Sequence, residues 1–184
     1  LHLSPLGPSV SLESASVETP SIDSLSIESL NVSPSIMSLI KQQPGGSIVA
    51  QNVLGGNVSV DLLPDSSGGD KKLSALNLNA EKISLKNLAQ SFKLQIPISG
   101  SVDSQIRATL DLAFTEQPDG EINAQIKNFI MPATTLNLPN LGALNVPEVK
   151  LSVVDLKSKL QAGKLTITSA QIGSPNDDLS GSIK

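Results

Sequence analysis

Apolar and polar residues alternate over long stretches of this chain, and short glycine-containing turns separate the stretches. Across residues 9–33, apolar side chains recur at every second position, as at Val10 and Leu12 and again at Leu25 and Ile27, with Ser, Glu and Asn between them. A period of two predicts β-strands that have one apolar and one water-exposed face. The alternative is a serine-rich disordered tail, but the sustained alternation favours strands.

Glycine stands at the start of many of these runs. In each case a polar residue and then an apolar residue follow the glycine and begin the alternation, as at Gly46, Gly56, Gly100, Gly120, Gly163 and Gly181. We expect these glycines to supply the positive φ that tight hairpin turns require. The best-formed hairpin is predicted between residues 102–114 and 121–130, and another turn between strands is predicted at 137–142.

Short helices are expected to interrupt the strands. The first is predicted at residues 33–43, where Ser33 is a candidate N-cap, Pro34 opens the helix, and a Pro-Gly-Gly sequence at 44–46 ends it. This helix would cover one end of the sheet. A second helix is expected around residues 86–92, and a third near 154–160.

One pattern of apolar residue, Ser, apolar residue, any residue, small polar residue and Leu occurs three times, at 25–30, 83–88 and 151–156. The second and third copies align without gaps over 73–88 and 141–156. This suggests a duplication of residues 73–120 as 141–183. Repeated β units that stack usually form an extended sheet or groove.

The composition favours a thin sheet over a thick core. Only three aromatic residues, all Phe, are present among 184 residues, and aliphatic side chains supply the rest of the 39% hydrophobic content. Aromatic side chains bury the most area per residue. We therefore predict a mainly β fold: a single domain over 1–184, with repeated antiparallel strands that form an extended, curved sheet or groove, and two or three short helices.

Composition also argues against several functions. The net charge is −4 and Arg107 is the only arginine, so nucleic-acid binding is not expected. The chain has no cysteine, and its one histidine, His2, is at the terminus. These features exclude a thiolate metal site and leave no His-based triad. No catalytic residue and no cofactor-binding residue is predicted, and we expect a protein that is not an enzyme.

Two acidic clusters are weak candidates for calcium, at residues 65–70 and 176–178. Neither has the alternating oxygen ligands and the closing bidentate carboxylate of a known calcium loop. Asp, Asn and Gly also form turns by bonding to their own backbone. We therefore read both clusters as turns and predict no metal-binding residue.

No apolar run approaches the roughly 20 residues that span a bilayer. The chain opens at Leu1 without a Met and ends at Lys184, directly after a strand-like start. We expect any membrane anchor to lie outside this sequence.

The order of segments resembles the type II secretion system protein N (GspN) family, and the β units are also similar to the AsmA/TamB class of envelope proteins. The resemblance covers about residues 25–184 and is carried by aliphatic and glycine patterns. The segments concerned are 33–46, 53–58, 83–88, 94–102, the hairpin at Gly120, and 142–184, of which the last is the most family-like.

The resemblance implies the periplasmic β domain of an inner-membrane protein with one transmembrane helix. Such a protein is an accessory scaffold of the machinery that exports folded proteins across the outer membrane, and its partners are other secretion-system proteins. The alternative is a lipid or lipoprotein carrier, and an extracellular adhesin is a third possibility. An open trough along the sheet would favour the carrier, whereas a closed, side-chain-filled interior would favour the scaffold.

Overall fold

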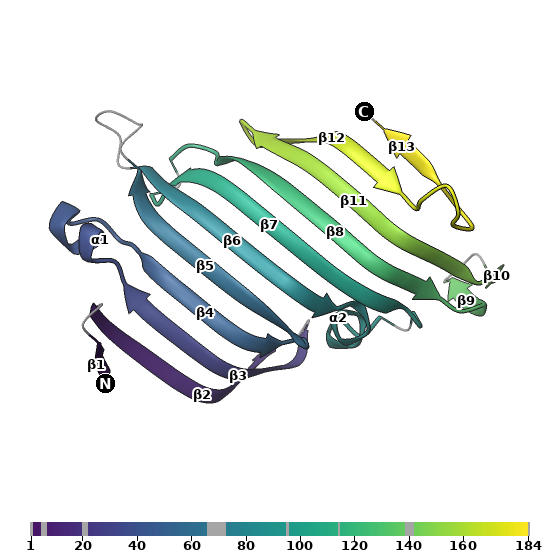
Figure 1. The fold of residues 1–184 in the computed structure, drawn as a ribbon, viewed down its shortest axis with the longest axis horizontal. Helices are drawn as coiled ribbons and strands as arrows, with labels where there is room; N and C mark the ends of the chain where they lie inside the picture. Colours follow the sequence, from purple (N-terminus) through teal and green to yellow (C-terminus); the bar gives the residue numbers. More distant parts are fainter. Residues whose placement is uncertain are drawn as a thin grey trace.

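One large antiparallel sheet dominates the structure, a computed structural model that describes residues 2–4, 7–19, 22–65, 73–94, 96–113, 115–138 and 142–183. Eleven strands pair in the order β1 to β8, then β11, β12 and β13, and the hairpin of β9 and β10 forms a separate two-stranded sheet (Figure 1). Each strand of the large sheet therefore pairs with its neighbours in the chain, except where β9 and β10 intervene. The mainly β, open-sheet prediction is confirmed.

The strands are β1 (His2–Ser4), β2 (Gly7–Thr19), β3 (Ile22–Pro34), β4 (Gly46–Val53), β5 (Gly56–Asp65), β6 (Leu73–Ser84), β7 (Ser99–Asp111), β8 (Asp119–Met131), β9 (Thr134–Leu138), β10 (Gly142–Val146), β11 (Val149–Gln161), β12 (Lys164–Ile172) and β13 (Gly181–Ile183). The predicted strands within 9–33 are confirmed as β2 and β3. The predicted hairpin is confirmed as β7 and β8, although Phe114 lies outside the described residues. β9 and β10 flank the predicted turn at 137–142, of which 139–141 lie outside the described residues.

Two of the three expected helices are present. α1 (Ile36–Lys41) lies within the predicted 33–43, and α2 (Leu85–Ser91) falls at the predicted 86–92. The predicted cap of α1 is wrong, because Ser33 and Pro34 belong to β3, and Ser35 Oγ instead accepts a hydrogen bond of 3.4 Å from the Ser38 backbone N–H. Ser84 caps α2, because its Oγ accepts a hydrogen bond of 3.3 Å from the Asn87 backbone N–H. The third helix, near 154–160, was wrongly predicted, because these residues belong to β11. β11 has hydrogen-bonded neighbours on both sides, β8 and β12, and these ladders favour the strand.

The strand-opening glycines have two different roles. Gly163 has φ +73 and follows Ala162, which also has positive φ, so the two residues form a tight hairpin turn. Gly100 also has positive φ. The expectation of positive φ is wrong for Gly46, Gly56, Gly120 and Gly181. At Gly56 and Gly120 the neighbouring strand is close instead: an added Cβ would lie 2.2 Å from Glu81 O and 2.6 Å from Arg107 O.

The two faces of the sheet differ in chemistry, because residues paired directly across strands share a face. One face, called the inner face here, carries three apolar rows. The first row is Leu12, Leu30, Ala50, Val58, Ala80, Ser104, Ala124, Leu156, Ala170 and Ile183; the second is Val10, Val32, Ile48, Val60, Leu78, Ile106, Ile122, Ser158 and Ile167; the third is Gly46, Leu62, Leu76, Ala108, Gly120, Leu160 and Leu165.

The opposite, outer face is polar. Between the first two inner rows runs an outer row of Ser11, Asn31, Val49, Ser59, Asn79, Gln105, Asn123, Lys157 and Ser169. Side-chain bonds join neighbours on this face, such as Gln105 Nε2 to Asn79 Oδ1 at 3.0 Å and Gln125 Nε2 to Asp155 Oδ1 at 2.7 Å. The two-sided alternation that the sequence predicts therefore extends over the whole breadth of the sheet.

In several strands, including β2, β4 and β6, the alternation shifts by one residue. The apolar positions step from Leu12 to Ala15 in β2, from Ala50 to Val53 in β4 and from Ala80 to Ile83 in β6. Within each step one residue has positive φ: Ser14, Asn52 and Lys82. The sheet register also shifts at the β4 and β6 steps. β-bulges bend a strand and increase its twist. These bulges let the inner face stay apolar while the strands change direction.

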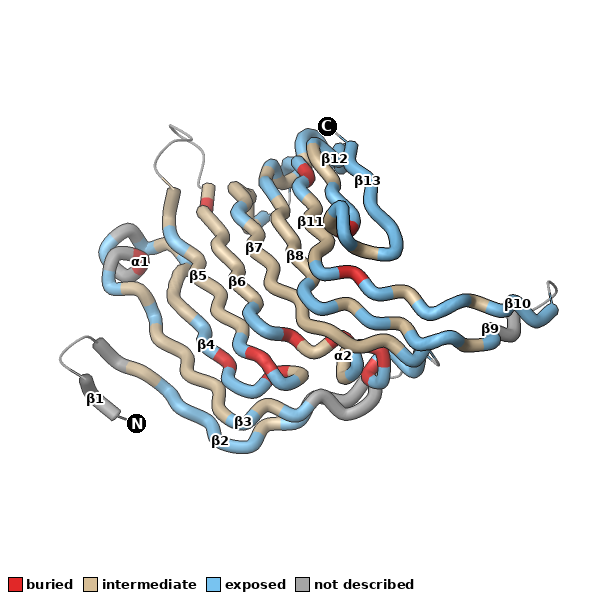
Figure 2. Tube along the Cα trace, turned by 45° about the vertical axis from the view of Figure 1, so that its right-hand side comes forward, coloured by how far each residue is buried: buried red, intermediate tan, exposed pale blue. Residues whose placement is uncertain are grey.

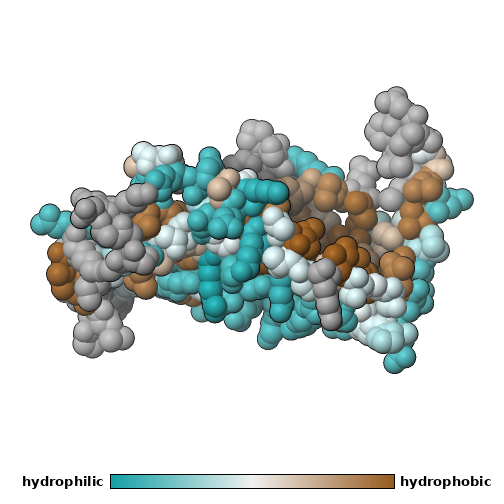
Figure 3. All heavy atoms as spheres, turned by 90° about the horizontal axis from the view of Figure 1, so that it is seen from above, coloured by the Kyte–Doolittle hydropathy of each residue, from teal (hydrophilic) through white to brown (hydrophobic). Residues whose placement is uncertain are grey.

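The sheet curves toward its apolar face. α2 contacts β3, β6 and β7, although β3 and β7 are separated by three strands. Figure 3 shows apolar residues gathered in the hollow of the sheet and polar residues on the outer surface. The chain exposes 12253 Å², whereas a compact monomer of 19.1 kDa would expose about 8,400 Å². The fold is thus a curved, open layer.

The two segments of the suggested duplication differ in local structure. Residues 73–88 form β6 and the start of α2, whereas 141–156 include β10 and the first half of β11. Leu85 therefore lies in a helix, whereas Val153, its counterpart in the repeat, lies in a strand. The duplication itself stays a prediction.

Candidate functional site

The three apolar rows of the inner face form a continuous surface, called the trough here. Its side chains are aliphatic, apart from the hydroxyls of Ser104 and Ser158. The first row crosses ten strands, and because adjacent strands lie about 4.8 Å apart, it extends for roughly 40 Å. The backbone N–H and C=O groups beneath the inner strands are used by the ladders on either side.

Most of the trough is uncovered. Among the described residues, only six apolar side chains are buried: Leu85 and Ala89 on α2, Ile83 just before it, Ala50 and Val53 on β4, and Leu151 on β11. By contrast, Ile48 on β4 is 41% exposed and Ile167 on β12 is 55% exposed, although both belong to the second row. Figure 2 shows the same pattern, with the central strands mostly half-buried. α2 closes one end of the trough, and α1 contacts β5 at the other end.

A groove is present at the other end, next to α1. It has a volume of about 380 Å³. Its apolar lining comes from the second and third rows and from the segment that leads into α1: Val32, Pro34, Ile48, Val60, Leu62 and Leu76. This groove is mainly apolar, and it opens where β3 ends and β4 begins.

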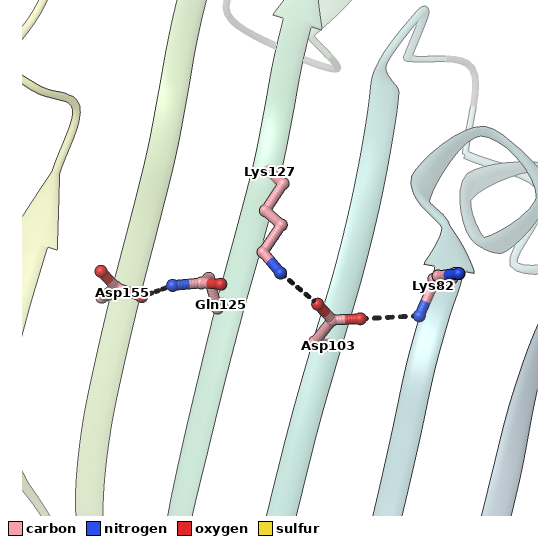
Figure 4. Close-up of polar contacts among 5 residues, drawn as sticks. All are labelled: Lys82, Asp103, Gln125, Lys127 and Asp155. Atoms are coloured by element: carbon pink, nitrogen blue, oxygen red, sulfur yellow. Dashed lines mark hydrogen bonds and ion pairs between the residues drawn. The ribbon is translucent and has the colours of Figure 1, made fainter.

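On the outer face, a polar cluster holds the bulge of β6. The backbone N–H of Lys82 donates a hydrogen bond of 2.7 Å to Asp103 Oδ1, and Lys127 Nζ lies 2.7 Å from Asp103 Oδ2 (Figure 4). The hydrogen bond from Lys127, together with that from the Lys82 backbone, lowers the pKa of the Asp103 carboxyl below its ordinary value. The bulge of β4 has a similar arrangement, since the Asn52 N–H donates to Asn57 Oδ1 at 3.4 Å.

The acidic cluster at 176–178 is a turn, as predicted. Asp177 Oδ2 accepts hydrogen bonds from the backbone N–H groups of Ser174 at 2.7 Å and Ser152 at 2.8 Å, and from Ser152 Oγ at 2.7 Å. These bonds, with that from Ser174 first, lower the pKa of the Asp177 carboxyl. The Asp177 carboxylate therefore holds the connection between β12 and β13 against β11 by accepting these hydrogen bonds.

The other sequence candidates add no further site. Most of the cluster at 65–70 lies outside the described residues, and the structure does not describe the surroundings of the His2 side chain. Within the described ranges, no group of three or more His, Asp or Glu side chains is close enough to hold a metal ion. The two described helices are both too short to cross a membrane.

Sequence reasoning located the residues of the trough but not its openness. Alternation shows which residues share a face, yet the same pattern fits a covered core. The polar outer face was a usable signal. A single sheet needs a second layer to cover its apolar face, and two short helices are too small to form one.

The fold and the site together define a class of protein: an open, curved antiparallel sheet with an aliphatic inner face, closed at one end by a short helix. No protein-family model, curated protein or solved structure matches the chain.

Proposed function

We propose that this chain is a non-enzymatic lipid-binding protein that holds acyl chains in the trough. The observation that carries this proposal is the uncovered aliphatic face of the sheet. Soluble monomers rarely expose apolar patches larger than a few hundred Å² unless the patch binds something. The trough spans most of the strands of the sheet.

The chemistry of the trough favours hydrocarbon as its occupant. A bound polypeptide would bring backbone N–H and C=O groups into a surface whose own backbone groups are already paired, and burying unpaired polar groups is costly. An acyl chain brings no such groups. The roughly 40 Å row runs across the strands and gives the width of the trough, which leaves room for several acyl chains side by side.

The curvature argues against a second copy as the occupant. Two sheets pack face to face when their inner faces meet about 10 Å apart along their length. Two concave faces touch mainly at their rims and leave the middle of each unfilled. An occupant that lies inside the hollow would cover more of the apolar inner face.

The resemblance to the AsmA/TamB class supports the carrier as well, because that alternative was expected to show an open trough. The place of the chain in the periplasm, its membrane anchoring, and an accessory role beside type II secretion-system proteins stay predictions from the resemblance. A carrier with this shape is compatible both with an AsmA/TamB-like envelope protein and with an accessory protein of type II secretion.

Two neighbouring residues of β4 provide a matched test. Ile48 is 41% exposed on the inner face and Val49 is 39% exposed on the outer face. The proposal expects that Ile48→Asp weakens binding of a fluorescent fatty acid several-fold, whereas Val49→Asp leaves it unchanged. Lipid that co-purifies with each protein, measured by mass spectrometry, should follow the same order.

Circular dichroism should first establish that both variants keep the strand content of the wild type. The proposal is wrong if the folded wild type binds neither the fatty acid nor co-purifying lipid. It is also wrong if the two substitutions weaken binding equally, because the occupied face is then not the inner one.

A further inference from the structure

The described side chains of α1 are arranged opposite to those of a helix on a globular protein, with isoleucines outward and a serine inward. Ile36 and Ile40, four residues apart and therefore on one side of the helix, are 55% and 71% exposed. Ser38 faces the protein and is only 3% exposed. A surface helix normally buries its apolar side and exposes its polar one. The outward side of α1 is therefore suited to an apolar environment.

The inward side of α1 gives an independent indication. Ser38 Oγ has no hydrogen-bond partner within the described structure. It is packed against Gly45, where an added Cβ would lie 2.0 Å from Ser38 Oγ. The Ser35 N–H also donates to Gly45 O at 3.0 Å. The backbone thus fixes α1 in this orientation even though a polar atom is left unpaired and two isoleucines face outward.

The position and charge of α1 indicate what it meets. α1 follows Pro34 of β3, which lines the apolar groove at the open end of the trough. Residues 33–46 contain Lys41 and no acidic residue, within a chain whose net charge is −4. An apolar segment without acidic residues fits the surface of a bilayer that contains anionic lipid, where apolar side chains enter the headgroup boundary and no carboxylate repels the phosphates.

We propose that α1 docks the open end of the trough onto a lipid bilayer, with Ile36 and Ile40 inserted, so that acyl chains pass between the bilayer and the groove beside Pro34. This proposal rests on the proposed lipid-binding function and adds the source of the lipid and its route. α2, at the opposite end, closes the trough (Figure 1).

The test separates docking from binding. The double variant Ile36→Ser with Ile40→Ser removes the two exposed side chains, and neither contributes to a buried core. Its matched control, Leu144→Ser with Leu179→Ser, removes two apolar side chains of similar exposure, 51% and 57%. Each protein is mixed with vesicles of phosphatidylcholine and phosphatidylglycerol, and bound protein is measured by flotation. Uptake of a fluorescent fatty acid is measured both from these vesicles and from free solution.

The expected result is at least a tenfold loss of vesicle binding and of uptake from vesicles in the α1 variant, because each buried isoleucine contributes on the order of a tenfold factor. Uptake from free solution should be unchanged, and the control should behave as the wild type. Equal vesicle binding by all three proteins overturns the docking proposal. The docking proposal is also overturned if the α1 variant keeps its vesicle binding but loses self-association, because α1 then contacts a second copy of the chain. Failure of the wild type to take up fatty acid from solution would instead contradict the lipid-binding function itself.

Discussion

Asp103 on β7 accepts a hydrogen bond from the backbone N–H of Lys82 on β6, at the residue where β6 bulges. A bulge leaves a backbone group without its ladder partner, and the neighbouring strand here supplies a carboxylate in its place. The same carboxylate pairs with Lys127 on β8. Asp103 therefore joins three consecutive strands at the level where the sheet bends.

Replacing Asp103 should show how much this connection between the three strands stabilises the fold. We expect Asp103→Ala to lower the free energy of unfolding by about 0.5–1.5 kcal/mol, because the Lys82 N–H loses its acceptor and Lys127 loses a solvent-exposed partner. Asp103→Asn keeps an acceptor oxygen and should lose less. Urea denaturation followed by circular dichroism measures both. Equal losses in the two variants would show that the ion pair, and not the bulge N–H, is the part that matters.

The stability that Asp103 provides should depend on pH. The Lys127 and Lys82 hydrogen bonds lower the pKa of this carboxyl from its ordinary 3.8. A lowered pKa in the folded state stabilises the protein above the unfolded pKa, and this stabilisation is lost as the pH falls through the folded pKa. The difference in unfolding free energy between wild type and Asp103→Asn should therefore shrink as the pH falls below about 4. A difference that is constant from neutral pH to acid would contradict this assignment.

The bulge backbone itself can be tested at Lys82, which has φ +56. Glycine adopts this conformation without strain, whereas a β-branched residue does not. We expect Lys82→Val to cost about 1–3 kcal/mol of stability and Lys82→Gly to be close to neutral. Thermal unfolding of the two variants checks this. If valine is tolerated as well as glycine, the bulge is not needed at that residue.

The helix that closes the trough offers a pair of adjacent substitutions with opposite outcomes. Leu85 is 6% exposed, so Leu85→Asp would bury an unpaired charge and should cost several kcal/mol. Ser84→Asp should be nearly neutral, because Asp is as good an N-cap as Ser for α2. Ser84→Ala, which removes the cap, should lose about 1 kcal/mol. Expression yield and unfolding midpoints distinguish the three, and similar damage from Ser84→Asp and Leu85→Asp would contradict the capping role.

The sequence predicts the strands, the faces and two helices because each is encoded locally. Alternation defines β2 and β3, and the Pro-Gly-Gly sequence marks the end of α1, whereas Ser33 and Pro34 lie in β3 and do not open the helix. The helix expected at 154–160 fails because Val154, Leu156 and Leu160 also fit a strand, and only the pairing of β11 with β8 and β12 decides between the two. The bulges leave a trace in the sequence, in steps such as Ala80 to Ile83, but the partner of Lys82 depends on where β7 lies.

The candidate site was harder to predict for a related reason. The trough residues follow from alternation, but whether a face is covered depends on the whole arrangement of layers. The outward orientation of Ile36 and Ile40 is a second example, because their helical spacing with Leu39 predicts a buried side. Burial is a property of the assembled fold, and no local pattern reports it.

The near-sequential strand order has a consequence for how such a sheet assembles and changes. Because nearly every ladder joins strands that are neighbours in the chain, folding can begin at one hairpin and spread outward. Lengthening or shortening the chain by a hairpin at an edge would leave the interior ladders intact. A sheet of this kind can therefore change its span in steps of two strands, which lets evolution set the capacity of the molecule without redesigning its fold.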